Sequence, residues 1–431
     1  MNSETEASTM KQEETTALLP KLRFPEFRGT EEWKEKPLKA AAEINPANGG
    51  LPESFVYIDL ESVDAGELKA KDRISRVGAP SRAQRLVERG DIIYQVVRPY
   101  QRNNLLCEFD HDENYVASTG YAQLRANGNN RFLYQSIHID SFVGRVIAKC
   151  TGSNYPAINS SDLAEIHLPI PPTLIEQQKI ADCLSSLDEL IAAQARKAEA
   201  LKTHKKGLMQ QLFPREGETR PCFRFPEFQN AGEWEATTLG EYFCPIRNGF
   251  VGTATPYYTS SDGVPYLQGK NVKGGRIDAS NLIFITPEFH FRQKKSHLKT
   301  GDILMVQSGH VGECAVVGTD YEGCNCHALV ILSPSRNLNS EFFVHYFYAP
   351  AGELAIFQIT TGNTIKHILA SELKTLPVLV PKPAEQQRIA SCISNLDVLL
   401  TAEIQKLESL KTHKKGLMQQ LFPSTGGMSY E

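Results

Sequence analysis

An internal repeat organises the 431-residue chain. The sequence LKTHKKGLMQQLFP occupies residues 201–214 and returns, letter for letter, at 410–423. The residues before each copy, 176–200 and 385–409, also align without gaps. Upstream, the motif Arg-Phe-Pro-Glu-Phe occurs twice and is followed at the same distance by Trp33 and by Trp234. Repetition over such a long period indicates two similar structural halves.

Two divergent stretches, residues 35–172 and 236–382, alternate with the repeated segments and share only sparse landmarks. The landmarks include Gly-Asp pairs and Thr-Gly pairs, at 90–91 and 301–302 and at 151–152 and 361–362. They predict one shared fold that carries two different surfaces. Near-identical segments should meet the same partner twice, whereas divergent segments should meet two different targets. A duplication without functional meaning would not confine the divergence to one type of segment.

Apolar residues recur with alternating spacings of four and three inside each repeated segment, as in the a/d seam of a coiled coil. The first seam comprises Ile180, Leu184, Leu187, Ile191, Gln194, Ala198, Leu201, Lys205, Leu208 and Leu212. The second comprises Ile389, Ile393, Leu396, Leu400, Glu403, Leu407, Leu410, Lys414, Leu417 and Leu421. The polar members fall at matching places in the two seams. Polar seam residues can fix the register of two helices, or the seam can loosen there, and the sequence leaves both open.

Each predicted helix has roughly 37 residues and a length of about 55 Å at ~1.5 Å per residue. Prolines precede and end both helices, at 172, 214, 381 and 423. A helix this long cannot bury its seam alone, and two repeats related by an approximate two-fold axis favour antiparallel packing. Such a rod would separate two domains by at most about 16 base pairs at ~3.4 Å each. A heptad seam alone is also typical of a dimerisation coiled coil, but two intrachain copies beside divergent domains favour a spacer.

The composition indicates a cytoplasmic, non-membrane protein. No stretch approaches the roughly 18 apolar residues of a membrane span. Residues 1–20 lack the features of a secretory signal and indicate a polar, disordered tail. Nine cysteines without a paired CxxC frame are typical of a reduced compartment.

The net charge of −4 argues weakly against a nucleic-acid partner, but the distribution of charge matters more than its sum. The segment from Leu68 to Arg89 contains seven lysines and arginines and only two acidic residues. A second basic cluster runs from Arg292 to Lys299. An isolated basic cluster is more often a solvated surface, so these clusters gain weight only from the repeated architecture.

The order of parts is similar to that of the specificity (S) subunits of type I restriction–modification systems. The resemblance rests on three sequence features: the helix starts Pro171-Pro172…Glu176-Gln177-Gln178 and Pro381…Glu385-Gln386-Gln387, and the helix end Lys-Lys-Gly-Leu-Met-Gln-Gln-Leu-Phe. It covers about residues 20–423. It implies that each variable stretch is a target-recognition domain that reads one half of a split, asymmetric site in double-stranded DNA.

The same resemblance implies the partners. Two methyltransferase (M) subunits would dock on the repeated parts, and restriction (R) subunits would join the larger complex. The partner subunits would use S-adenosylmethionine, ATP and Mg for adenine methylation, DNA translocation and cleavage. The chain itself would be non-catalytic and would hold no cofactor or metal.

The expected fold class is α+β, with two α/β target-recognition domains separated by two long helices that pack as an antiparallel coiled coil in a pseudo-two-fold repeat. The expected segments are a tail (1–20), target-recognition domain 1 (21–172), spacer helix 1 (173–214), a linker (215–223), target-recognition domain 2 (224–382), spacer helix 2 (383–423) and a tail (424–431).

Base edges are read by side chains with defined donors and acceptors, and phosphates by cations. In the first domain a polar loop at 95–104 follows a strand candidate, and a second polar loop follows Gly152. The candidates there are Ser81, Arg82, Arg85, Arg98, Tyr100, Gln101, Arg102, Asn103, Ser153, Asn154 and Tyr155, the first three as phosphate contacts. The second-domain candidates are Lys270, Lys294, Lys295, Gln307, Ser308, His310, Asn363, Thr364, Lys366 and His367. For any single residue, a solvated loop is the alternative to DNA contact.

Catalytic signatures are missing from the sequence. It has no Asn/Asp-Pro-Pro-aromatic motif, no glycine-rich fingerprint for S-adenosylmethionine and no GxxxxGK[ST] loop. The segment Cys324-Asn325-Cys326-His327 lacks the second ligand pair of a metal site, so we expect strand residues there. Asp91 and Asp302 follow glycine and are expected in turns that enter buried strands. Two other classes stay as alternatives: a coiled-coil adaptor that binds two different proteins, and a stand-alone endonuclease.

Overall fold

A computed structural model of the chain describes residues 18–69, 71–109, 113–335, 338–363 and 365–424. Most of the two tails expected at 1–20 and 424–431 lies outside the described residues. The chain divides into two compact units, of which the first ends at Gln194 and resumes at Lys406, and the second is Ala195–Gln405. Each unit therefore holds one globular part, the first half of the long helix that follows it and the last half of the other long helix.

The globular part of the first unit contains two four-stranded sheets, ordered β6-β3-β10-β7 and β2-β11-β8-β9, and the pairs β1-β12 and β4-β5. Strands β3 and β10 run parallel. The strands are β1 Lys34–Pro37, β2 Ala42–Ile44, β3 Ser54–Ile58, β4 Val63–Asp64, β5 Glu67–Leu68, β6 Arg73–Ser75, β7 Ala83–Val87, β8 Ile92–Gln95, β9 Leu105–Leu106, β10 Tyr115–Ser118, β11 Tyr121–Ala126 and β12 His167–Ile170. The short helices are α1 Leu38–Ala41, α2 Asn130–Ser136, α3 Asp140–Lys149 and α4 Ser160–Ala164.

The second unit has sheets ordered β15-β19-β16-β22 and β14-β23-β20-β21, the pairs β13-β24 and β17-β18, and a parallel pair β16-β22. Its strand order differs from that of the first unit at one sheet edge, because β15 lies beside β19 whereas β7 lies beside β10. The strands are β13 Glu235–Thr238, β14 Phe243–Asn248, β15 Tyr258–Thr259, β16 Val264–Leu267, β17 Val272–Lys273, β18 Arg276–Ile277, β19 Ile283–Ile285, β20 Ile303–Val306, β21 Cys314–Val316, β22 Asn325–Cys326, β23 Leu329–Pro334 and β24 Pro377–Val380. The short helices are α6 Leu239–Tyr242, α7 Pro287–Arg292, α8 Ser340–Phe347, α9 Pro350–Ile359 and α10 Ala370–Thr375. The expected α+β class with two similar domains is confirmed.

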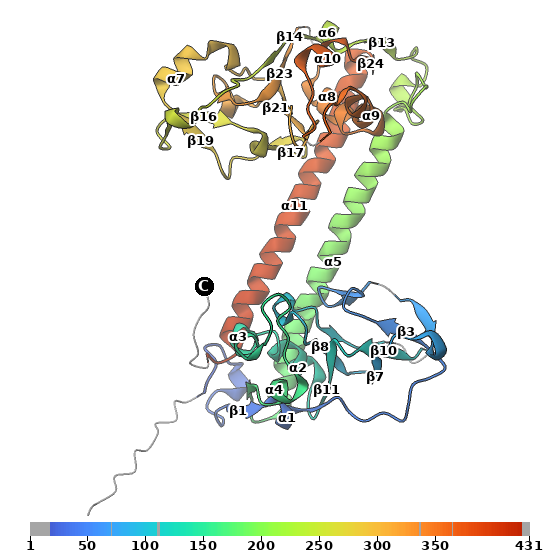
Figure 1. Ribbon diagram of the computed structural model, residues 1–431, viewed down its shortest axis with the longest axis vertical. Helices are drawn as coiled ribbons and strands as arrows, with labels where there is room; N and C mark the ends of the chain where they lie inside the picture. Colours follow the sequence, from blue (N-terminus) through green and yellow to red (C-terminus); the bar gives the residue numbers. More distant parts are fainter. Residues whose placement is uncertain (1–17, 70, 110–112, 336–337, 364, 425–431) are drawn as a thin grey trace, which may run out of the picture. The chain divides into compact units, whose positions relative to one another are not determined.

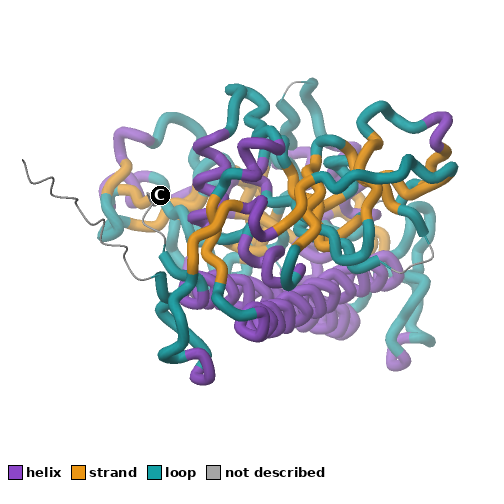
Figure 2. Tube along the Cα trace, turned by 90° about the horizontal axis from the view of Figure 1, so that it is seen from below, coloured by secondary structure: helices purple, strands orange, loops and turns teal. Residues whose placement is uncertain are grey.

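The long helices are α5, Leu174–Leu212, and α11, Pro383–Leu421, and both lie within the ranges expected from the repeat. Figure 1 labels them, and Figure 2 shows them in purple, viewed nearly end on. All residues of the two predicted seams are buried or half-buried. The heptad pattern therefore marks the faces that the helices bury.

Ion pairs join the two long helices within each unit. In the first unit, Lys414 Nζ lies 2.6 Å from Asp188 Oδ1. In the second, Lys205 Nζ lies 2.6 Å from Asp397 Oδ1, at the equivalent places of the repeat. Three of the polar seam residues, Lys205, Glu403 and Lys414, thus pair across the helices, Glu403 with Lys197 at 2.6 Å. Within each unit the start of one helix lies against the end of the other, so the packing is antiparallel and the pairs fix its register.

A buried salt bridge joins the Arg-Phe-Pro-Glu-Phe motif of the first unit to the start of α5. Arg23 donates from Nε and Nη2 to the two carboxylate oxygens of Glu176, both at 2.8 Å. The indole of Trp33 donates to Glu176 Oε1 at 3.1 Å. The side chains of Arg23 and Glu176 are 8% and 1% exposed, so this bidentate pair lies away from solvent. The bond to Glu176 raises the pKa of Arg23.

The second unit builds the same salt bridge. Arg224 donates to the two oxygens of Glu385 at 2.7 and 2.6 Å, and Trp234 donates to Oε1 at 3.4 Å. The backbone just before each motif bonds to the end of the other helix, Leu22 N to Gln420 O and Phe223 N to Gln211 O, both at 2.9 Å. The repeated motif therefore ties the start of one long helix to the end of the other in each unit.

Phenylalanines at the helix ends complete the two cores. Phe422, just after α11, packs against Trp33 and Phe132 in the first unit. Phe213, just after α5, packs against Trp234 and Phe342 in the second. The identical Leu-Phe-Pro that ends each repeat thus serves as a core segment of the opposite globular part.

We expect Glu176→Gln to lower the free energy of unfolding by about 3 kcal/mol, because it leaves the Arg23 guanidinium buried without its counter-ion. The exposed pair Lys39–Glu165 in the same unit provides the control, and Glu165→Gln should change stability very little. Urea denaturation followed by tryptophan fluorescence suits this comparison, since Trp33 contacts the altered carboxylate. Equal small effects of the two substitutions would contradict a structural role for the buried pair.

Candidate nucleic-acid interface

Two matched turns form the frame of the candidate site in each unit. In the first, Val96 O accepts from Ile158 N at 3.0 Å, and Arg98 N donates to Pro156 O at 2.7 Å. In the second, Gln307 O accepts from Ile368 N at 3.0 Å, and Gly309 N donates to Lys366 O at 3.2 Å. The loop after β8 or β20 is thereby tied to the later loop at 151–157 or 361–367. The polar loops that were singled out from the sequence do meet, and they meet in the same way in both units.

Arg98 and Gly309 occupy the same place in these frames, and both have a left-handed backbone, with φ of 55° and 83°. Glycine adopts this conformation readily, whereas a residue with a Cβ is strained there. The guanidinium of Arg98 lies over the ring of Tyr155, 4.4 Å from its centre. The first unit therefore tolerates backbone strain at a position where it presents a cation.

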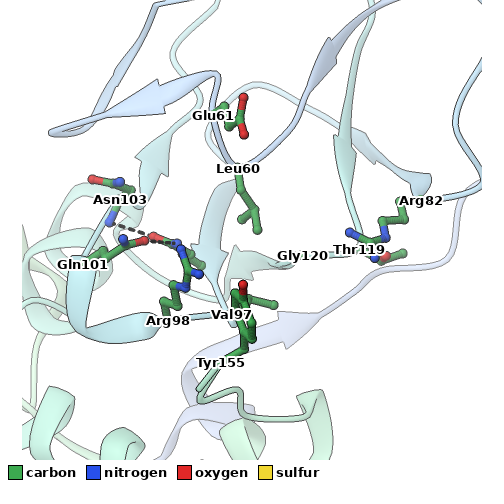
Figure 3. Close-up of a pocket in the computed structure, with 11 residues that line it drawn as sticks. Leu60, Glu61, Arg82, Val97, Arg98, Gln101, Asn103, Thr119, Gly120 and Tyr155 are labelled. Carbon is green, nitrogen blue, oxygen red and sulfur yellow. Dashed lines mark hydrogen bonds between the residues drawn. The ribbon is translucent and has the colours of Figure 1, made fainter. Parts of the chain in front are cut away.

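A hollow of about 740 Å³ opens beside Arg98 in the first unit. Its lining includes Glu61, Arg82, Gln101 and Tyr155. Figure 3 shows Arg98, Gln101 and Asn103 grouped on one flank, Glu61 above them, and Arg82 with Thr119 across the hollow. The site thus presents two guanidinium groups, several amides and one carboxylate, which is the kind of surface that base edges and phosphates can meet.

Buried amides support the rim of this hollow. Asn104 Oδ1 accepts from Gln95 N at 2.8 Å, and Asn104 Nδ2 lies 3.1 Å from His138 Nε2. His138 Nδ1 lies 2.6 Å from the carbonyl of Tyr134, so the proton sits on Nδ1 and Nε2 accepts from Asn104. Burial lowers the pKa of His138 to about 4, which keeps the ring neutral near pH 7. Gln95 and Asn104, which the sequence placed in a polar loop, are 1% and 2% exposed and belong to this support.

The predicted residues of the first unit fall into three groups. Tyr100, Gln101, Ser153, Asn154 and Tyr155 are exposed around the meeting loops. Arg102 forms an ion pair with Asp140 at 2.7 Å and donates to His138 O, and the Asn103 backbone bonds to Gln95, so these two help to hold the loop. Ser81 and Arg82 are exposed just before β7, whereas Arg85 is half-buried and burial lowers its pKa.

The basic cluster at 69–89 carries less free positive charge than its sequence indicates. Lys69 pairs with Glu67, and Arg73 pairs with Glu113 at 2.9 Å. Arg76 donates to the carbonyl of Leu51 at 3.1 Å. Acidic partners brought in by the fold, from outside the cluster, neutralise part of it.

In the second unit, Ser308, His310, Asn363, Lys366 and His367 are exposed where the two loops meet, and Gln307 is half-buried beside them. Thr364 lies outside the described residues. Lys366 Nζ lies 5.3 Å from the centre of the Phe357 ring. This side-chain set has no counterpart in the first unit, although the backbone frame is the same.

The remaining second-unit candidates lie on two short 3-10 helices outside the meeting loops. Lys294 and Lys295 are exposed on a short 3-10 helix after α7, where Lys295 O accepts from Arg247 Nε at 2.9 Å. Lys270 is exposed on a 3-10 helix, Gly269–Asn271, next to β16. A Cβ built on Gly269 would lie 3.5 Å from Val306, the last residue of β20, so Lys270 stands near the meeting loops.

The turn that carries Lys270 aligns it with a residue of the first unit that was not among the predicted candidates. Ser62 N bonds to Asp59 O in the first unit as Asn271 N bonds to Gln268 O in the second. The next bonds also match, Lys69 N to Ser62 O and Asp278 N to Asn271 O. Glu61 therefore occupies the place of Lys270. Without the matched bonds, no sequence signal aligns these two residues of opposite charge.

Comparisons with known proteins agree with this architecture. The sequence model of the type I restriction modification DNA specificity domain matches residues 90–203 and 231–412, which is more than half of the chain. The chain belongs to the type I restriction–modification specificity family. It is 27% identical over 270 residues to the "putative type I restriction enzyme MjaX specificity subunit" of Methanocaldococcus jannaschii, covering 62% of this chain and 61% of that protein. It is 22% identical over 281 residues to the EcoBI specificity subunit of Escherichia coli, covering 62% and 59%.

Solved structures show the same fold. The crystal structure of a type I restriction–modification S subunit from M. genitalium has a TM-score of 0.57 at 17% identity, covering 95% of this chain and 100% of that one. A chain from a study of complex assembly and conformational transition of a type I R-M system has a TM-score of 0.54 at 22% identity, covering 91% and 98%. The alignments to the two curated relatives span about three fifths of their length.

The other sequence motifs of this chain have structural explanations. Asp91 is 1% exposed, accepts from Glu88 N at 2.8 Å and pairs with Arg125 at 2.9 Å, and Gly90 has φ of 92°. Asp302 caps the equivalent turn by accepting from Lys299 N at 3.0 Å. Residues 325 and 326 form strand β22. Within the described ranges, no group of three or more His, Cys, Asp or Glu residues is placed to hold a metal, and no helix is long and apolar enough to span a membrane.

We expect an exchange of the two left-handed residues to separate backbone strain from function. Arg98→Gly should leave stability nearly unchanged, because relief of the strained backbone offsets the lost contact with Tyr155. Gly309→Arg should destabilise the protein by about 1 kcal/mol, because it introduces that strain. Thermal denaturation measures both variants. A large loss of stability in Arg98→Gly would show that the side chain holds the fold and would weaken its assignment to a binding surface.

Proposed function

We propose that this protein is the DNA-reading subunit of a type I restriction–modification enzyme and that its two globular units each read one half of a bipartite, asymmetric site in double-stranded DNA. One observation carries this proposal. The same backbone frame presents Arg98, Gln101 and Glu61 in one unit and Ser308, His310 and Lys270 in the other. Conserving a frame while replacing its polar side chains suits two readers of different sequences. Exposed cations and amides suit DNA better than the apolar patch expected of a protein-binding adaptor.

The repeated parts support a second element of the proposal, the docking of two methyltransferase subunits. The segments 201–214 and 410–423 are identical in sequence and expose equivalent side chains, among them His204 and Lys206 in one copy and His413 and Lys415 in the other. Two equal surfaces in one chain can bind two copies of one partner. Restriction subunits would join this assembly.

The long helices would act as the spacer between the two half-sites. The ion pairs Asp188–Lys414 and Asp397–Lys205 lock their register within each unit, which a device that sets a fixed gap requires. The chain itself would be non-catalytic. Methylation with S-adenosylmethionine, and translocation and cleavage with ATP and Mg, would belong to the partner subunits.

Binding of the full chain to duplex DNA should weaken steeply as salt rises, because phosphate contacts release counter-ions. The double variant Lys294→Glu with Lys295→Glu should reduce the affinity for all sequences and lower the slope of log affinity against log salt by about two. Lys206→Glu, an exposed cation on α5, is the matched control and should leave the slope unchanged. Fluorescence anisotropy at several salt concentrations provides the measurement. Binding that does not depend on salt would contradict the proposed function.

A further inference from the structure

Gln95 is an almost fully buried amide that lines the hollow of the first unit and supports the exposed side chains around it. It ends strand β8 and is 1% exposed. Its Oε1 accepts from the backbone N–H of Asn103 at 3.2 Å, and its Nε2 donates to Oε1 of Gln101 at 2.9 Å. Gln101 is exposed and lines the hollow of the first unit. Gln95 is thus a relay between the fixed backbone and an exposed side chain.

The backbone fixes the orientation of both amides. An N–H can only donate, so the Gln95 atom that faces Asn103 must be its oxygen. The Gln95 amine group therefore faces Gln101, and the Gln101 atom that it meets must be an acceptor, the oxygen. The amine group of Gln101 is left for the hollow. A side chain that could offer either a donor or an acceptor is held so that it offers a donor.

Arg98 stands beside Gln101 and adds further donors. The backbone of Gln101 bonds to Arg98 O at 3.0 Å, and Figure 3 shows the two side chains on the same flank of the hollow. A guanidinium has N–H donors and no acceptor. Its contact with the Tyr155 ring uses the face of the group, which leaves the N–H edges available. This flank of the hollow is therefore a donor surface.

A surface of adjacent donors matches the major-groove edge of only one of the four bases. Guanine presents two adjacent acceptors, N7 and O6, whereas adenine replaces the second acceptor with an amine donor. Cytosine presents a donor, and thymine a single acceptor beside a methyl group. We propose that the hollow of the first unit selects a guanine, and that buried Gln95 sets this choice by holding the Gln101 amine outward. The inference rests on the proposed DNA-reading function and adds the base that one half-site contains.

The second unit lacks this relay. The matched bonds of the two frames place Val306 where the first unit has Gln95, and valine cannot orient a neighbouring amide. The second unit also has Lys270 at the position that Glu61 occupies in the first unit. The donor surface set by Gln95 is therefore a property of one half-site only, and its alteration should leave the other half-site unchanged.

Selection of DNA from a randomised duplex library by the full chain tests the inference. The unaltered chain should select a motif in which one block, identified as the block that Arg98→Gly alters, contains a guanine preferred over adenine by about tenfold or more. In Gln95→Glu both carboxylate oxygens accept, so Gln101 must turn its amine inward and its oxygen outward. The preference at that position should move from guanine to adenine, because Arg98 can then donate to N7 while Gln101 accepts from the adenine amine. The other block should stay the same.

Two further variants at the exposed position keep the test decisive if Gln95→Glu does not fold. Gln101→Glu should also shift the preference away from guanine, since its outer oxygen accepts, whereas Gln101→Lys should keep guanine, since it still donates. A motif without guanine in the block that Arg98→Gly alters, or an unchanged motif in both Gln95→Glu and Gln101→Glu, would overturn the inference and leave the proposed function standing. Failure of the unaltered chain to select any motif would instead overturn the proposed function.

Discussion

Glu176 and Glu385 are buried carboxylates at the starts of the two long helices, and each holds an arginine and a tryptophan of the repeated motif. Such a carboxylate is stable only with its partners in place, so the motif, the helix start and the neighbouring helix end must assemble together. This requirement explains where the sequence is repeated. The residues that build the buried pair and the core phenylalanines are the same in both halves, and the helix seam keeps the same spacing. The strands and loops at a distance from the pair are free to differ.

The two units differ in the side chains that they place on a shared backbone frame. The loops after β8 and β20 are held by the same hydrogen bonds in the two units, and a left-handed residue stands at the same place in both. The side chains on this frame differ chemically between the units. Where the first unit has a strained arginine, a glutamate and a buried glutamine, the second unit has a glycine, a lysine and a valine at the equivalent positions. Changes of this kind alter what a surface can bind without altering how the domain folds. They would connect the duplicated architecture to the proposed reading of two unlike half-sites.

The sequence predicted the features that depend on local pattern. Heptad spacing located both helices and their buried faces, and the glycine of each Gly-Asp pair located the turn into a buried strand. Features that depend on contacts between residues far apart in the sequence could not be predicted. Nothing near Gln95 indicates that Asn103 and Gln101 would enclose it, and Asp140 and Glu113 neutralise arginines from more than thirty residues away. The equivalence of Glu61 and Lys270 is visible only through matched backbone bonds, because the sequences around them have diverged.

We propose that one chain carries two unlike DNA readers whose spacing is fixed by matched helices. The most direct measurement is the full DNA motif selected by the unaltered chain, determined by sequencing of the bound fraction of a randomised duplex library. We expect two blocks of dissimilar sequence separated by a constant number of unspecified base pairs. A single continuous block, two blocks at variable distances, or two copies of one block would contradict the proposal.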